Sequence, residues 1–462
     1  MNLAWATARA REPADRSVLQ GDPAGLLSRL AARTLTVGVI GLGYVGLPLV
    51  RSFWRTGFPV VGFDIDPEKV SALNAGHSYI RHFPAEDVKT LLASKRFSAT
   101  TDFSGLKDAD AILICVPTPL SRNREPDLSY VVATAESILP HLRPGHLVVL
   151  ESTTFPGTTA EVVRPILERN GLQIGRDIFV AFSPEREDPG NQHFETATIP
   201  KVVGADDAVS RMLVQELYRT SISEVVPVSS AATAEAVKIC ENIFRSVNIA
   251  LVNELKIVFE RMGIDVWEVI DAAKTKPFGF MAFYPGPGLG GHCIPIDPFY
   301  LSWKAREFSV PTRFIELAGE INSAMPAHVV ERLARSLDER FGKGMKGARI
   351  LLVGLAYKKN VDDMRESPSL TIMELLRARQ ADVTYYDPFI PVIGHTREHG
   401  ELAGMRSASF DRETVGAFDA VLICTDHDEV DYQSLVDWSR LVVDARNATR
   451  GVEGNRDRIV KA

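Results

Sequence analysis

One cysteine lies in a setting suited to nucleophilic chemistry. Cys293 follows the glycine- and proline-rich run at 284–292, and Asp297 comes four residues after it. A thiol in an open loop can approach a substrate carbon, whereas the other three cysteines fall in apolar runs or a helical pattern typical of packing. His292 directly precedes the thiol, but one adjacent His–Cys pair makes a poor tetrahedral metal site. We therefore predict a nucleophile here, with metal binding as the weaker alternative.

Two further segments carry polar groups that can assist such a thiol. AEAVKICEN places Lys238 and Asn242 four residues apart, on one face of a helix. An ammonium and a carboxamide that project together can stabilise a developing oxyanion. FSPEREDPGN places Glu185 and Glu187 in a loop whose shape is fixed by prolines. Lone lysines and glutamates are usually solvated, so these assignments depend on the elements around them.

A third motif predicts a nucleotide site. In GLGYVG, Gly41 permits a tight turn, Gly43 lets a pyrophosphate approach the backbone, and Gly46 allows close helix–strand packing. The next predicted strand ends at Asp64, where a carboxylate binds ribose hydroxyls and repels a 2′-phosphate. The pattern favours NAD over NADP. A glycine-rich turn without a cofactor is the alternative.

The elements that must position these groups alternate between strands and helices from residue 35 onward, which is typical of a parallel sheet covered on both faces. Ligands bind at the carboxyl ends of such strands. Thr118, Glu151, Thr153 and Thr154 follow the third and fourth strands, so we expect them at a cofactor or substrate. We predict strands at 36–40, 59–63, 111–115, 146–150 and 178–182.

The later parts of the chain differ in character. Apolar residues recur at helical spacing from about Ser229 to Arg340, which predicts a helical centre that also packs against a partner subunit. The segments ARILLVGLAYK, DVTYYDP, FDAVLICTD and SRLVVDARN then repeat the first four strand motifs in order. The predicted fold is α/β, with two Rossmann-like doubly wound domains flanking a central helical domain. The predicted parts are an extension at 1–33, an NAD-binding domain at 34–228, a helical dimerisation domain at 229–340 and a second nucleotide-binding fold at 341–462.

Composition limits the partners. The 462 residues carry a formal charge of −7 with a pI near 5.9, which gives no general reason to bind nucleic acid or anionic membrane. No apolar run is long enough to span a bilayer, and the first 33 residues lack the apolar core of a secretory signal. We expect a cytoplasmic protein.

The motifs together resemble one family. GLGYVGLP, ESTTFPGT, SPEREDPGN, KICEN, GPGLGGHCIPIDP and VGLAYKKNVDDMRES are similar, in order, to the UDP-glucose/GDP-mannose dehydrogenase family, and their wording looks most like bacterial UDP-N-acetylglucosamine 6-dehydrogenases. The resemblance implies an NAD-dependent four-electron oxidation of a sugar C6 alcohol to a carboxylate, for surface polysaccharide or O-antigen precursors.

The resemblance also implies roles for individual residues. Cys293 would carry a thioester, Lys238 and Asn242 would stabilise oxyanions, and Asp297, with Thr154 holding a water, would handle protons. Glu185 would assist thioester hydrolysis. Further cofactor contacts are expected at Tyr44, Val45, Lys69, Thr118, Thr153 and Arg365. The Rossmann-like domain at 341–462 would bind the UDP-sugar. Further substrate contacts are expected at Arg186, Tyr284, Gly290, Lys358 and Arg446. The predicted assembly is a homodimer or higher oligomer.

Several readings stay open at this point. The sugar can be UDP-N-acetylglucosamine, UDP-N-acetylmannosamine or UDP-glucose, because pocket shape decides it. A two-electron alcohol dehydrogenase similar to 3-hydroxyacid dehydrogenases would share the first domain and the helical centre, but it would lack the C-terminal repeat. A non-catalytic nucleotide-sugar sensor would not need Lys238, Asn242, Cys293 and Asp297 together.

Overall fold

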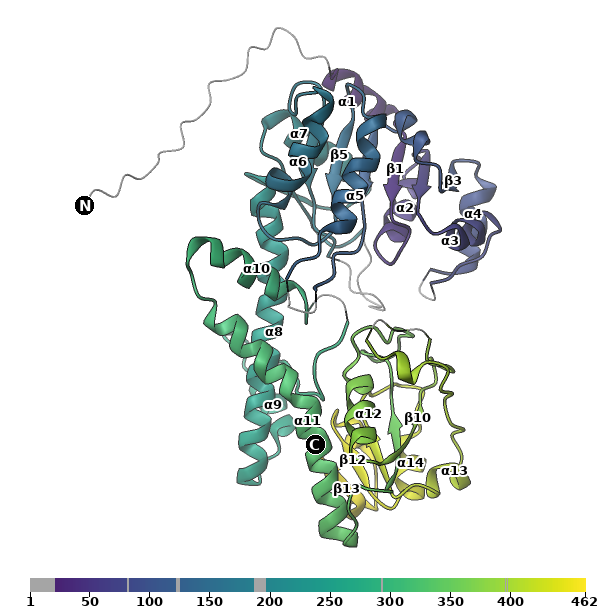
Figure 1. Cartoon of the computed structure of the whole chain (residues 1–462), viewed down its shortest axis with the longest axis vertical. Helices are drawn as coiled ribbons and strands as arrows, with labels where there is room; N and C mark the ends of the chain where they lie inside the picture. Colours follow the sequence, from purple (N-terminus) through teal and green to yellow (C-terminus); the bar gives the residue numbers. More distant parts are fainter. Residues whose placement is uncertain are drawn as a thin grey trace, which may run out of the picture.

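The computed structural model describes residues 21–80, 83–121, 125–186, 197–291, 294–394, 396 and 398–462. Two α/β lobes are arranged one above the other, and long helices lie beside both (Figure 1). The predicted fold class is confirmed: each lobe is built on a sheet, and the helical centre separates the two in sequence.

The first sheet has the order β3-β2-β1-β4-β5-β6-β7-β8, and only the β6–β7 pair is antiparallel. The five predicted strands are confirmed to within one residue at each end, whereas β3, β7 and β8 were not predicted. The strands are β1 (Val37–Ile40), β2 (Val60–Phe63), β3 (Phe97–Thr100), β4 (Ala111–Ile114), β5 (Leu147–Leu150), β6 (Phe179–Phe182), β7 (Lys201–Gly204) and β8 (Val225–Val228).

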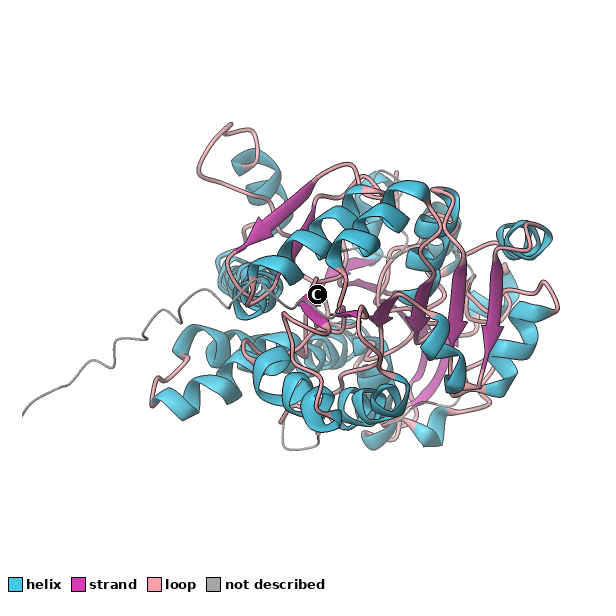
Figure 2. Ribbon diagram, turned by 90° about the horizontal axis from the view of Figure 1, so that it is seen from above, coloured by secondary structure: helices cyan, strands magenta, loops and turns pink. Residues whose placement is uncertain are grey.

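Helices cover both faces of this sheet, as the view from above shows (Figure 2). Each face has its own apolar core, one centred on residues such as Phe53 and Leu217 and the other on residues such as Ile112 and Leu167. The helices are α1 (Pro23–Ala32), α2 (Gly46–Arg55), α3 (Pro67–Asn74), α4 (Ala85–Ala93), α5 (Ser129–Ile138), α6 (Arg164–Leu167) and α7 (Ala208–Arg219).

Helix α1 was not predicted, because its segment was assigned to an extension. Asp22 caps it by accepting a hydrogen bond from Gly25 N at 3.0 Å. Leu26 and Leu30 are buried in the first core, where α1 packs against α7. This part of the expected extension therefore belongs to the first lobe, and residues 1–20 lie outside the described part of the chain.

The helical centre is dominated by two long helices that lie side by side (Figure 1). Ser230 caps the first of them by accepting a hydrogen bond from Thr233 N, and Gly263 ends it in a left-handed conformation. Asn253 donates to Asn322 across the buried contact at 2.9 Å, which fixes the register of the pair. The helices are α8 (Ala231–Met262), α9 (Val266–Ala273), α10 (Asp297–Ala305) and α11 (Arg313–Phe341).

The second sheet has the parallel order β10-β9-β11-β12-β13. Its first four strands repeat the order β2-β1-β4-β5, as the sequence repeat predicts. Val329 and Leu333 of α11 lie in its core, so one helix joins the centre to this lobe. The elements are β9 (Arg349–Val353), α12 (Pro368–Ala378), β10 (Asp382–Tyr386), α13 (Arg412–Gly416), β11 (Ala420–Ile423), α14 (Tyr432–Trp438), β12 (Val442–Asp444) and β13 (Ile459–Lys461).

Candidate active site

The turn between β1 and α2 has the geometry that its three glycines predict. Gly41 has φ +91°, and a Cβ there would lie 2.3 Å from the Cys115 carbonyl oxygen. A Cβ on Gly46 would lie 1.8 Å from the Gly41 carbonyl oxygen. Apart from Gly43 and its chain neighbours, no atom of the described residues lies within 4 Å of the Cβ position of Gly43, so a phosphate can reach the backbone there. The turn fits the pyrophosphate of NAD.

Asp64 lies beside this turn, at the end of β2. Its carboxylate accepts a hydrogen bond from Leu42 N at 2.8 Å and another from Asp66 N at 3.0 Å. Lys69 approaches the same carboxylate at 3.7 Å, and Val45 is the N-cap residue of α2. A buried acid in this position fits the ribose hydroxyls of NAD.

Arg365, from the second lobe, reaches the glycine-rich turn. Its guanidinium carbon is 4.4 Å from the centroid of the Tyr44 ring, and Asp363 pairs with it at 2.6 Å. The Arg365 carbonyl oxygen accepts a hydrogen bond from Gly291 N at 3.1 Å. One residue therefore links the predicted cofactor turn to the predicted catalytic loop.

The threonines after β4 and β5 differ in their surroundings. Thr118 is buried, and its carbonyl oxygen accepts a hydrogen bond from the Tyr300 hydroxyl at 2.7 Å. Thr153 is partly buried. Thr154 is 1% exposed, and its hydroxyl has no hydrogen-bond partner among the described residues. A buried hydroxyl without a partner is a site for a water or a ligand.

Glu235 anchors the segment that follows Thr154, and sequence reasoning missed it. This buried carboxylate of α8 accepts hydrogen bonds from Gly157 N at 2.5 Å and Thr159 N at 2.8 Å, and from the Thr159 hydroxyl at 2.7 Å. It caps the helical turn that begins at Thr159. Its three-residue spacing from Lys238 is the signal that would have placed it on the same helix face.

The structure brings the predicted catalytic residues of α8 and α10 together. Asn242 donates a hydrogen bond to Oδ2 of Asp297 at 2.6 Å. Lys238, one turn away on α8, donates to the Glu185 carbonyl oxygen at 2.5 Å. All three side chains are buried. The ammonium, amide and carboxyl groups thus form one polar cluster at the end of the first sheet.

Asp297 has the protonation behaviour of an acid–base group. It lies in the first turn of α10 and is 2% exposed. Burial raises the pKa of Asp297 to about 7, while the charge of Lys238 and the hydrogen bond from Asn242 act in the opposite direction. A carboxyl group with a pKa near neutrality can both accept and return a proton at physiological pH.

His292 and Cys293 lie outside the described residues, but the loop before them is closely packed. A Cβ on Gly290 would lie 2.6 Å from Cβ of Tyr357, and Gly291 has φ +79°. Only glycine fits this path between the lobes. The structure therefore describes the residues on both sides of the predicted nucleophile.

Glu185 belongs to a buried ionic network. Lys201 Nζ lies 2.9 Å from its Oε2 and 2.7 Å from Oε2 of Glu151. The Tyr218 hydroxyl donates to the other oxygen of Glu151. Glu151 was expected to meet a ligand, but its carboxylate is instead paired inside the protein. Sequence reasoning missed Lys201 and Tyr218, and Glu187 lies outside the described residues.

Two predicted substrate contacts are not brought into the cluster. Arg186 pairs with Glu241 at 2.6 Å and donates to the Pro200 carbonyl oxygen at 2.6 Å. Tyr284 is 42% exposed, and its hydroxyl donates to Asp271 of α9 at 2.7 Å. Neither side chain has a described contact with Lys238, Asn242 or Asp297.

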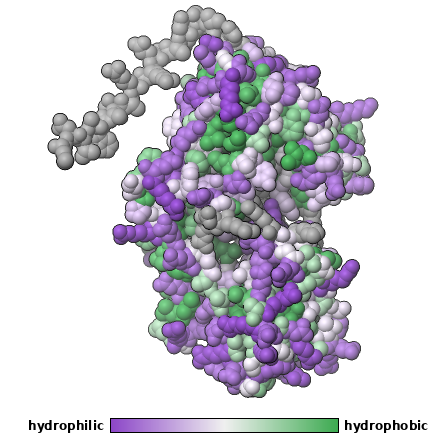
Figure 3. All heavy atoms as spheres, viewed as in Figure 1, coloured by the Kyte–Doolittle hydropathy of each residue, from purple (hydrophilic) through white to green (hydrophobic). Residues whose placement is uncertain are grey.

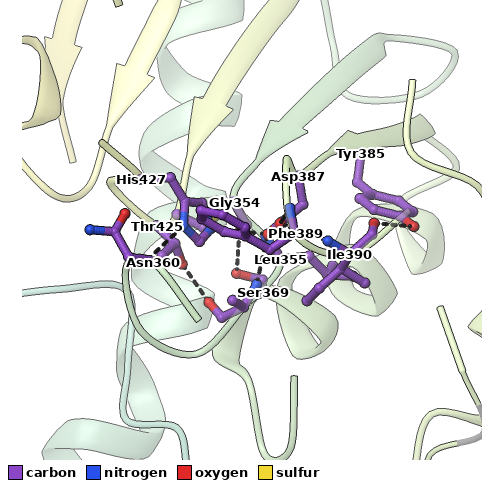
Figure 4. A network of polar contacts seen from close by, with 12 residues as sticks. Gly354, Leu355, Asn360, Ser369, Tyr385, Asp387, Phe389, Ile390, Thr425 and His427 are labelled. Atoms are coloured by element: carbon purple, nitrogen blue, oxygen red, sulfur yellow. Dashed lines mark hydrogen bonds and ion pairs between the residues drawn. The ribbon is translucent and has the colours of Figure 1, made fainter. Parts of the chain in front are cut away.

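The glycine turn of the second lobe is filled by the protein itself. Oδ2 of Asp387, at the position that matches Asp64, accepts hydrogen bonds from Leu355 N at 2.7 Å and Ala356 N at 3.0 Å. His427 Nε2 lies 3.0 Å from the same oxygen, and both side chains are fully buried (Figure 4). Asn360 N donates to His427 Nδ1 at 2.9 Å, which leaves Nε2 as the ring nitrogen that faces Asp387.

Two predicted substrate cations lie near this turn and the catalytic loop. Lys358 is partly buried and belongs to the segment 356–360, which forms part of this turn. Arg446 follows β12, and its Nε donates to the Cys424 carbonyl oxygen at 3.0 Å. A Cβ on Gly286 would lie 2.6 Å from Nη1 of Arg446, so this arginine packs against the loop.

A cavity of about 720 Å³ lies between the lobes. Its lining comes from the first lobe, the helices and the second lobe, including Pro117, Asn322 and Arg365. Leu289 and Ile294, from either side of the catalytic loop, line it as well. The interface between the lobes therefore has room for a ligand beside the loop.

Comparison with known proteins decides the family. Three models of the UDP-glucose/GDP-mannose dehydrogenase family match in order: the NAD binding domain at 35–222, the central domain at 232–324 and the UDP binding domain at 351–451. The UDP-N-acetyl-D-glucosamine 6-dehydrogenase of Pseudomonas aeruginosa is 36% identical over 399 residues, 86% of this chain and 92% of that protein. The chain belongs to the UDP-glucose/GDP-mannose dehydrogenase family. It is an NAD-dependent UDP-sugar dehydrogenase, so the predicted cofactor and family are confirmed.

Other members of the UDP-glucose/GDP-mannose dehydrogenase family are similarly related. The UDP-N-acetyl-D-mannosamine dehydrogenase of Pyrococcus horikoshii is 35% identical over 420 residues, 89% of this chain and 96% of that protein. A solved structure of UDP-D-ManNAc dehydrogenase from the same organism has a TM-score of 0.82 at 33% identity, covering 90% of this chain and 96% of that chain.

Among the described residues, no helix is both long enough and apolar enough to cross a bilayer. The described residues also contain no group of three or more His, Cys, Asp or Glu side chains arranged to hold a metal ion. On the face drawn in Figure 3, hydrophobic (green) and hydrophilic (purple) residues are intermixed.

Proposed function

We propose that this dehydrogenase oxidises the C6 alcohol of a UDP-N-acetylhexosamine, with UDP-N-acetylglucosamine as the first choice, to the carboxylate. The balanced reaction consumes one alcohol, two NAD⁺ and one water, and gives one carboxylate, two NADH and three protons. The observation that carries the proposal is the buried hydrogen bond from Asn242 to Asp297. Lys238 lies one helical turn from Asn242, and Asp297 follows Cys293 by four residues. Bound NAD would supply the hydride acceptor, held by the turn at Gly43 and by Asp64.

The residues of the chain divide the work between two stages. After the alcohol is oxidised to an aldehyde, the Cys293 thiolate adds to C6, and loss of a second hydride leaves a thioester. Lys238 and Asn242 stabilise the oxyanion that forms at C6, and Asp297 holds the exchanged proton. A water held by the Thr154 hydroxyl, or one activated by Glu185, then releases the acid.

The second candidate substrate is UDP-N-acetylmannosamine. The similarity to the Pyrococcus horikoshii enzyme, at 35% identity, is nearly the same as that to the Pseudomonas aeruginosa enzyme at 36%. We expect the highest kcat/KM with UDP-N-acetylglucosamine in a panel that also holds UDP-N-acetylmannosamine, UDP-N-acetylgalactosamine, UDP-glucose and GDP-mannose. A higher value with UDP-N-acetylmannosamine would reverse the order of the two candidates.

Stoichiometry tests the four-electron scheme. Each UDP-sugar consumed should give two NADH, and Cys293→Ala should abolish full turnover. One NADH per sugar, with aldehyde accumulating, would contradict the scheme, as would normal turnover by Cys293→Ala. Glu185→Gln should accumulate a sugar adduct on the enzyme, which intact-protein mass spectrometry detects.

The same proposal includes the domain division at 34–228, 229–340 and 341–462, with α1 added to the first domain, and a homodimer formed through α8. Large apolar side chains on α8 are exposed at heptad-like spacing. These are Phe244 at 47%, Leu251 at 52%, Val258 at 45% and Met262 at 62%. A stripe of this kind on a long helix fits a second copy of the chain.

A further inference from the structure

The single antiparallel pair in the first sheet brings a lysine to the reactive end of the strands. In a parallel strand, the first residue would lie at the opposite edge from the ligand crevice. Strand β7 runs against β6, with Gly204 opposite Phe182. Continuing that antiparallel register by three residues puts Lys201, the first residue of β7, opposite Glu185.

The side chains complete this arrangement. Lys201 is 3% exposed, and its Nζ is shared between Glu185 at 2.9 Å and Glu151 at 2.7 Å. Glu151 is held from the other side by the Tyr218 hydroxyl. The second oxygen of Glu185 accepts a hydrogen bond from Arg186 N at 2.8 Å. The Glu185 carboxylate therefore has an orienting donor on each of its two oxygens.

The positive charge of Lys201 is needed to keep the carboxylates of Glu151 and Glu185 close together in the protein interior. Burial works against its positive charge, but the two carboxylates together hold the pKa of Lys201 above its usual range. Without that ammonium, Glu151 and Glu185 would face each other as buried carboxylates, and like charges in such a pair share a proton. A protonated Glu185 cannot accept a proton from water.

We propose that Lys201 is a positioning residue for thioester hydrolysis: it keeps Glu185 ionised and oriented, so that Glu185 can activate the water that releases the acid from Cys293. The step breaks the C–S bond, forms a C–O bond to water, and returns the thiolate, while Glu185 receives the proton. The inference rests on the proposed function, because it assumes a thioester at Cys293.

The test separates oxidation from hydrolysis. Lys201→Met removes the charge at nearly constant length. At pH 7 the variant should release a burst of two NADH per active site at nearly the wild-type rate, and then turn over on the order of 10²-fold more slowly. Intact-protein mass spectrometry should show the acyl adduct. Turnover should recover as pH rises, because the stranded carboxylates ionise. Burst and turnover that fall equally, with no adduct, overturn the inference.

Lys304 supplies a matched control. Its Nζ also bridges two glutamates, Glu161 at 2.6 Å and Glu307 at 2.7 Å, and its side chain is only 6% exposed. Lys304→Met should keep the wild-type burst, turnover and pH profile. A hydrolysis defect in this variant as well would show a general effect of losing a buried lysine, and it would overturn the specific role of Lys201.

A second variant covers loss of folding. Lys201→Met combined with Glu151→Gln removes the stranded anion together with the cation, so it should fold. Because no second carboxylate then competes with Glu185 for a proton, hydrolysis at pH 7 should be faster than in Lys201→Met, but slower than in the wild type because the orienting contact of Lys201 is missing. Product release no faster than in Lys201→Met, or equal to that of the wild type, overturns the inference. Glu185→Gln tests the role of Lys201 and the thioester separately. An adduct in Glu185→Gln but in neither Lys201 variant rejects the role of Lys201 alone. No adduct in any of these variants rejects the thioester itself.

Discussion

The amide nitrogen of Asn242 lies 2.6 Å from Oδ2 of Asp297, joining the long helix α8 to the first turn of α10. The contact fixes one carboxylate oxygen, and the other has no hydrogen bond to any described residue, so it is available to a substrate or a water. Because Lys238 lies one turn away on the same helix, the pair defines where negative charge is stabilised.

Replacing Asp297 with Asn should remove the acid–base group while keeping the shape of the site. We expect kcat to fall by about 10²–10⁴-fold. The base acts in its unprotonated form, so wild-type turnover should rise with pH through about 7, the pKa of Asp297. Initial rates from pH 5 to 9 check this, and a rise in the variant with the same midpoint would assign the titration to another group.

The same variant should be more stable than the wild type at alkaline pH. Folding raises the pKa of Asp297 to about 7, so the folded state favours the protonated form. The associated stability is present below the unfolded pKa of about 4 and is lost as pH rises through about 7. Thermal melting at pH 5 and pH 8 should show the Tm advantage of Asp297→Asn growing with pH. An advantage that shrinks would contradict the assignment.

Asp64 should determine the choice of dinucleotide. Asp64→Asn keeps an acceptor for Leu42 N but removes the charge that repels a 2′-phosphate. We expect KM for NAD to rise roughly tenfold, consistent with a weakened hydrogen bond to the ribose, and the preference over NADP to shrink. Steady-state kinetics with both dinucleotides measure this. An unchanged NAD/NADP ratio would show that selection lies elsewhere.

His427 should influence the binding of the UDP-sugar and not the binding of the dinucleotide. His427→Leu strands Asn360 N and removes the His427 contact from Oδ2 of Asp387, and so loosens the turn that carries Lys358. We expect KM for the UDP-sugar to rise on the order of tenfold, from the loss of buried hydrogen bonds, while KM for NAD stays constant. Tyr385→Phe, in the same cluster but bonded to Ile390, is the control. Equal increases in both KM values would indicate general destabilisation.

The exposed stripe of α8 should hold two copies together. Leu251→Glu places a charge in the centre of the stripe, and it should convert dimers to monomers in sedimentation experiments. Val392→Glu changes a similarly exposed apolar residue in the second lobe and should leave the mass unchanged. A dimer that survives Leu251→Glu would place the interface on another surface.

Local patterns predicted most of the first sheet and the polar cluster. Apolar runs bounded by turns identified β1, β2, β4, β5 and β6, and helical spacing put Lys238 and Asn242 on one face. In these cases the signal lay within about ten residues of the group concerned. The acid–base role expected of Asp297 came from the family resemblance and not from its place after the glycine-rich loop.

Long-range contacts were not predictable in this way. The position of Lys201 depends on the reversed direction of β7, which is not encoded in the sequence KVVG itself. For the same reason Glu151 was expected at a ligand, since its lysine partner lies 50 residues away. Tyr284 lies in a motif-rich loop, but its hydroxyl bonds to α9.

Helix α8 presents Glu235, Lys238 and Asn242 to the protein interior in its first turns and exposes Leu251 and Val258 further along. Every added residue turns an α-helix by about 100° and lengthens it by about 1.5 Å. A single insertion after Asn242 would therefore swing the exposed side chains out of phase with the reactive ones, even if each residue type were kept. The length of helix α8 is a constraint in its own right, separate from the chemistry of any of its side chains.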